Sequence, residues 1–132
     1  MNRSEALSAA GTALGGVDDF SLVLIGPRRR YTASPAIILA GASTYPDTDL
    51  RTRDSDELGH EIAAMLLIQS DEDQEAAVEA QMGDLVETTI TTLEAVGFIF
   101  VRSDAAAGVF LPVIDGIAYR TERLIFRADA TE

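Results

Sequence analysis

The stretch that decides the fold is residues 60–102, HEIAAMLLIQSDEDQEAAVEAQMGDLVETTITTLEAVGFIFVR. In residues 60–69 every even position from 62 to 68 is apolar, which favours a strand with one buried face over a helix. Residues 71–95 predict a helix, because acidic side chains stand at its start and an apolar stripe follows at helical spacing: Val78, Met82, Leu85, Val86, Thr89, Ile90 and Leu93. Gly97 is typical of the residue that ends a helix, and residues 98–102 predict another strand. The stretch therefore predicts a strand–helix–strand unit.

Working toward the N-terminus, two short apolar runs predict further strands. They are residues 20–25, FSLVLI, and residues 36–40, AIILA. Before them, residues 3–14 predict a helix, since Asn2 with Glu5 three residues later resembles a capping box and Gly15 and Gly16 can end it. Between residues 42 and 58 the chain is polar, and we expect a long polar loop or an extended hairpin there.

Toward the C-terminus, residues 108–114 and 117–126 predict two more strands. The Asp115-Gly116 pair between them favours a tight hairpin. Pro112 indicates that the first of the two is an edge strand or carries a bulge.

This order of elements predicts an α+β fold. A mostly antiparallel β-sheet with two α-helices packed on one face accounts for it, and 132 residues suit one domain spanning 1–132.

Composition excludes several classes of function. The net charge of −12 disfavours general nucleic-acid binding. The absence of Cys excludes disulfides and thiolate sites, and the absence of Lys excludes a P-loop or Schiff-base lysine. No apolar run reaches the roughly 18 residues of a membrane helix, and the start of the chain lacks the apolar segment of a secretory signal. We therefore expect no membrane partner.

Candidate chemical groups are few. The one histidine, His60, lacks the second His of a zinc-binding H-E-x-x-H motif, because position 64 is Ala. The acidic residues between 47 and 57 do not follow the spacing of a calcium loop, so a solvated acidic loop is the leading interpretation and weak divalent-ion binding the alternative. No G-x-G-x-x-G or G-x-S-x-G motif occurs. We expect no catalytic residue, cofactor or metal, and no enzyme activity.

Charged segments are better candidates for protein contact. Arg28, Arg29 and Arg30 form a dense basic cluster that is either a solvated turn or a docking patch. In a ring of identical subunits this cluster could meet the charged connection of the next copy, whose candidate residues are Asp47, Asp49, Arg51, Arg53, Asp54, Asp56 and Glu57. The final strand carries Arg120, Glu122, Arg123 and Arg127, which indicate either protection of a sheet edge or an interface.

Taken in order, these features resemble the tail terminator proteins of long-tailed bacteriophages, the lambda-type group. The resemblance lies in Pro35-Ala36-Ile37-Ile38-Leu39-Ala40 followed by Tyr45-Pro46-Asp47, in MLLIQS leading into the long acidic-start helix, and in Asp115-Gly116-Ile117-Ala118-Tyr119 before RTERLIF. It covers nearly the whole chain.

The resemblance implies a structural virion protein that forms a ring, a homohexamer, at the head-proximal end of the tail tube. Its partners would be its own copies, the tail tube protein and the head–tail connector or stopper protein, with DNA passing through the lumen. It would be assembled in the host cytoplasm and reside in the neck region of the virion. The alternatives are a head–tail connector or neck protein and a small ligand-binding α+β domain.

Overall fold

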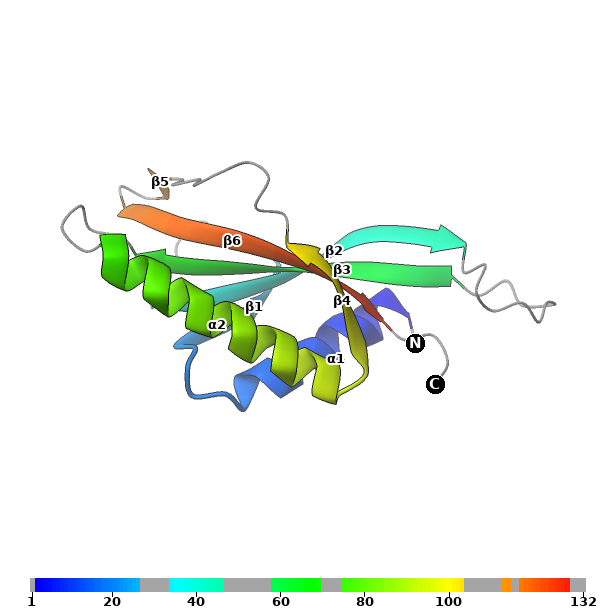
Figure 1. Cartoon of the computed structure of the whole chain (residues 1–132). Coiled ribbons are helices and arrows are strands. Elements are labelled where there is room, and N and C mark those ends of the chain that lie inside the picture. The colour runs from blue at the N-terminus through cyan, green and yellow to red at the C-terminus, as the bar shows by residue number, and fades with distance from the viewer. Residues whose placement is uncertain are drawn as a thin grey trace.

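The structure, a computed structural model, describes residues 2–26, 34–46, 58–69, 75–103, 113–114 and 117–128. Its elements follow in chain order (Figure 1): α1 Arg3–Gly15, β1 Leu22–Ile25, β2 Ala36–Pro46, β3 Leu58–Gln69, α2 Glu75–Ala95, β4 Phe98–Ser103, β5 Val113–Ile114 and β6 Ile117–Ala128.

The strands form a mixed sheet in the order β1-β2-β3-β6-β4, with β5 pairing separately with β6. β1 and β2 are parallel, and every other pairing among the described strands is antiparallel. Both helices pack on one face of this sheet (Figure 1). The prediction of an α+β fold with a mostly antiparallel sheet and two helices on one face is confirmed.

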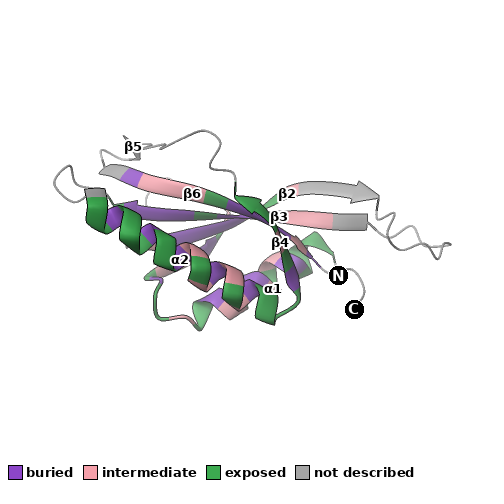
Figure 2. Ribbon diagram, viewed as in Figure 1, coloured by how far each residue is buried: buried purple, intermediate pink, exposed green. Residues whose placement is uncertain are grey.

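The main core lies between the sheet and the helices. From β3 it takes the even-numbered residues Ile62, Ala64, Leu66 and Ile68, which confirms the alternation seen in the sequence. In α2 five residues of the predicted stripe are buried, namely Val78, Met82, Leu85, Thr89 and Leu93. Figure 2 shows the result: the helices turn their buried positions toward the sheet and their exposed positions outward.

Local signals set the ends of both helices. The Asn2 side chain accepts a hydrogen bond of 2.8 Å from the Glu5 amide, and the Glu5 carboxylate accepts one from the Asn2 amide, so the predicted capping box is present. After α2, Gly97 adopts φ +100°, the left-handed conformation that glycine reaches without strain.

β2 and β3 form a hairpin that extends past residue 40 into the segment 42–58, where the sequence predicted a long polar loop or an extended hairpin. Pairing runs from Ala36 with Leu67 to Pro46 with Leu58, with a register shift between Gly41 and Ser43. The prediction that β2 ends at residue 40 is therefore wrong. Of the predicted loop or hairpin at 42–58, residues 42–46 and residue 58 are strand, and 47–57 lie outside the described residues.

Other boundaries differ less. Ile114 pairs with Ile117, which is the register of the predicted two-residue hairpin. Of the predicted strand 108–114 only 113–114 is described, and residues 71–74 before α2 are not. Neither α1 nor α2 is both long and apolar enough to span a membrane.

Candidate interaction surfaces

The charge pair predicted from the sequence lies outside the described residues. This holds for Arg28, Arg29 and Arg30, and equally for Asp47, Asp49, Arg51, Arg53, Asp54, Asp56 and Glu57. Their role as contact residues stays a prediction. The described parts of the chain form two other charged surfaces.

His60 lies on β3, where it pairs in register with Thr44 of β2. It is half-buried and has an interaction partner. Within the described ranges, no three His, Asp or Glu side chains gather where they could hold a metal ion.

The charged final strand has described neighbours on both sides only over part of its length. β6 pairs with β3 over residues 119–127, with β4 over residues 124–128 and with β5 at residues 117–118. Arg127 therefore lies between two strands, and edge protection is wrong for it. Arg120, Glu122 and Arg123 pair with β3 alone among the described strands, so edge protection of these three stays a prediction. Because successive residues of a strand face opposite sides, these charges divide between the two faces of the sheet.

Two of them, Arg120 and Glu122, face α2. Arg120 Nε and Nη2 donate to the two carboxylate oxygens of Glu79 at 2.5 and 3.1 Å, and Nη2 lies 3.5 Å from Glu122 Oε1. Its Nη1 also donates to the carbonyl oxygen of Thr121. The hydrogen bond from Arg120 lowers the pKa of Glu79 against a smaller opposing effect of burial, and the same bond raises the pKa of Arg120. This cluster fastens α2 to β6 and is a structural contact.

The other two, Arg123 and Arg127, lie on the face that the helices leave uncovered. Arg123 pairs in register with Met65 of β3, and Arg127 with Ile99 of β4. Arg102 of β4 pairs with Ile125 and lies on the same side. We call Met65, Ile99, Arg102, Arg123 and Arg127 the arginine face.

The arginine face combines charge with exposed apolar surface. Met65 is 38% exposed and Ile99 is 42% exposed, high values for large apolar side chains. Arg102 and Arg123 are exposed, and Arg127 is half-buried. Another part of this side of the sheet holds a second buried cluster, made of Ala36, Ile38, Leu67 and Tyr119. Among the described residues of this side, Met65 of β3 and Ile99 of β4 are exposed large apolar side chains.

The outer side of the helix layer has the opposite charge. Exposed carboxylates stand on α2 and on the turn after α1, and we call this set the acidic helix surface: Asp18, Asp19, Asp84, Glu87 and Glu94. The segment Glu75–Ala95 contains no basic residue.

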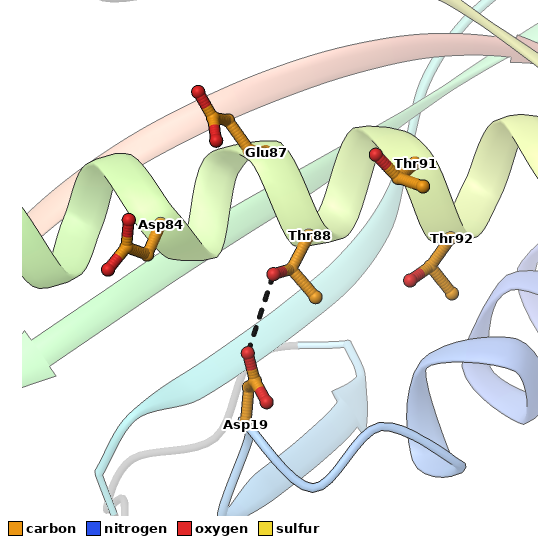
Figure 3. A pocket seen from close by; sticks show the side chains of 6 residues that line it. All are labelled: Asp19, Asp84, Glu87, Thr88, Thr91 and Thr92. Carbon is orange, nitrogen blue, oxygen red and sulfur yellow. Dashed lines mark hydrogen bonds between the residues drawn. The ribbon is translucent and has the colours of Figure 1, made fainter.

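An open hollow of about 560 Å³ lies in this surface, lined by Asp19, Asp84, Glu87, Thr88, Thr91 and Thr92 (Figure 3). Thr88 Oγ1 donates to Asp19 Oδ2 across 3.4 Å. The hollow is shallow and its lining is acidic and hydroxylic, so it suits a cationic group more than an apolar ligand.

A scan of protein-family models and a search of curated proteins found no match to this chain.

Sequence reasoning noticed the charges of β6 but missed the arginine face. The missing information was the side of the sheet on which each residue lies, which depends on the register between β3, β6 and β4. Arg102 was not predicted as a contact residue, because a single Arg at the end of a predicted strand does not indicate a surface until its neighbours across the sheet are known.

Proposed function

We propose that this chain is a structural, non-enzymatic assembly protein that forms a ring at the head-proximal end of a phage tail tube. The ring, a homohexamer, ends polymerisation of the tube and joins the tail to the connector of the filled head. Its work is binding, with no bond chemistry.

One observation carries the proposal. The sheet is covered by helices on one face only, and on its other face Met65 and Ile99 are exposed between arginine side chains. Arginine and methionine are enriched in protein interfaces, and the apolar stems of arginines add to the surface that a partner can bury. A surface of this kind supports protein contact as the activity of the chain.

The resemblance of the sequence to tail terminators is the second support for the proposal. It lies in the motif Pro35–Ala40, in the strand that leads into the long acidic-start helix, and in Asp115–Tyr119. Six copies in a ring would combine individually modest contacts into a durable joint.

Electron microscopy of particles assembled with and without the chain tests the proposal. Overlong tails in its absence, returned to uniform length by adding the purified chain, are the expected result. Tails of normal length that never join heads would instead identify a connector or neck protein. Normal tails joined to heads in its absence would refute both roles.

The hollow beside α2 favours a second candidate, a small α+β domain that binds a cationic ligand. A thermal shift assay with divalent ions and cationic metabolites distinguishes the two. A ligand-binding domain would gain several degrees in Tm with a saturating ligand, whereas an assembly protein would show no such gain.

A further inference from the structure

We propose that the arginine face of one copy docks on the acidic helix surface of a second copy, so that identical chains join head to tail. This inference rests on the proposed function in one respect: the contact would be the joint between neighbouring subunits of the ring. The two surfaces lie on opposite sides of the molecule, one on the sheet and one on the helix layer (Figure 1).

Charge complementarity is the first argument. The arginine face carries three arginines, and among the described residues the carboxylate that pairs with them in register is that of Glu61, opposite Arg127. Arg123 and Arg127 have interaction partners within the chain, and Arg102 is exposed at the end of β4. The acidic helix surface carries five carboxylates, all exposed. Because the guanidinium group offers a planar set of donors, it can bind a carboxylate through two hydrogen bonds at once. Opposed charges of this kind set the register and the specificity of a contact.

The difference between the two surfaces determines the symmetry. Two arginine faces would repel each other, and so would two acidic helix surfaces. The contact must therefore join unlike surfaces, which is the heterologous, head-to-tail type that closes into rings when the rotation allows it. A two-fold dimer through either surface is disfavoured.

The shape of α2 is compatible with close approach. Ala80 and Gly83 are exposed on the helix, and a Cβ added at Gly83 would meet nothing within 4 Å. Packing inside this chain therefore does not require glycine there, although glycine weakens a helix interior by about 1 kcal/mol relative to alanine. Close packing of a neighbouring copy against this part of α2 explains why a residue without a side chain stands at position 83.

Nucleic acid is a poorer occupant of the arginine face. The chain has a net charge of −12, so its long-range electrostatic field repels the phosphates of an approaching nucleic acid. The attraction of the three arginines acts only at shorter range. The exposed Met65 and Ile99 also gain more from an apolar or small-residue protein surface than from a phosphate backbone.

A charge swap between two variants tests the contact. Arg102→Glu reverses the sign at the arginine face, and Glu87→Arg reverses it at the acidic helix surface. Each variant by itself then places like charges together at every joint, and we expect its association constant in low salt, measured by sedimentation velocity, to fall about tenfold or more. In an equimolar mixture every joint between unlike variants is again a matched pair, so assembly should return.

The control is Arg3→Glu, which makes the same change of charge on α1, outside both surfaces. It should associate like the original chain. Circular dichroism establishes that each variant is folded; all three replaced side chains are exposed. Salt should weaken the association of the original chain, because exposed charges are screened beyond about 10 Å at 0.1 M ionic strength.

Several results would overturn the inference. One is an original chain that stays monomeric at high concentration in low salt; another is a mixture that assembles no better than either variant. If Arg102→Glu lost binding to duplex DNA while its sedimentation stayed unchanged, the face would bind nucleic acid and the inference would fail. None of these results alters tail length in particles, so failure of this joint is distinguishable from failure of the ring function.

Discussion

Replacing Arg120 by methionine keeps much of the apolar length of the side chain but removes the charge that joins α2 to β6. The Arg120 side chain is 12% exposed, its partner Glu122 is 16% exposed, and Glu79 is 53% exposed. The variant leaves Glu122 shielded from water without its nearby cation. It leaves Glu79 largely hydrated.

The expected loss lies between two limits. Breaking a fully buried ion pair costs about 3–5 kcal/mol, and an exposed pair is worth about 0–1 kcal/mol. Because Glu79 remains half in solvent, we expect Arg120→Met to lower the free energy of unfolding by about 1–2 kcal/mol. Urea unfolding at neutral pH, followed by circular dichroism, measures this difference.

The effect should depend on pH with a definite sign. The hydrogen bond from Arg120 lowers the pKa of Glu79 in the folded state. The ionised Glu79 therefore stabilises the fold fully above the pKa it has in the unfolded chain, and this contribution is lost as the pH falls through the lowered pKa. The difference in free energy of unfolding between the original chain and Arg120→Met should be largest at neutral pH and should decrease in acid.

A matched control is Glu79→Gln, which keeps the size of the side chain and removes its charge. It should cost less than Arg120→Met, because Arg120 keeps Glu122 as a partner. A loss above 3 kcal/mol for Arg120→Met would mean that the pair behaves as buried. If the difference in free energy of unfolding stayed the same in acid, the ionised Glu79 would not be the group that Arg120 stabilises.

The remaining predictions concern backbone and core. Gly83→Ala should raise the free energy of unfolding by about 0.5–1 kcal/mol in urea titrations, because its Cβ meets no atom within 4 Å and alanine favours the helix; a loss would mean that α2 is irregular there. Gly97→Ala should lower stability by about 1 kcal/mol or more, since φ is +100° at this position; an unchanged midpoint would contradict that conformation. Phe126→Ala should cost about 3–5 kcal/mol, because the ring is fully buried and packs on Phe100 at 5.5 Å between centroids; a cost below 1 kcal/mol would place Phe126 outside the core.

Much of the fold could be predicted because burial leaves a periodic trace in the sequence. The even positions of β3 and the stripe of α2 face one core, so their apolar residues recur at the period of their element. In β2 this apolar periodicity covers only the first part of the strand. Beyond Ala40 the strand continues through small and polar residues, and pairing with β3 extends it there without an apolar signal.

The surfaces were harder to predict, because they depend on which strands become neighbours. β6 lies in the middle of the sheet, which no local pattern in residues 117–128 reveals. Once it pairs with β3 and β4, alternation sends Arg120 toward α2 and Arg123 toward the opposite face. The interface predicted at Arg28–Arg30 and at 47–57 stays a prediction, since those residues lie outside the described part of the chain.

The most direct test is to add the purified chain to tail tube protein while it polymerises and to image the tubes by electron microscopy. We predict that growth stops, and that averaged images show one six-fold ring at a single end of each tube. Tubes that lengthen unchanged, with the chain left unbound in solution, would contradict the proposal that ring assembly on the tube is what this protein does.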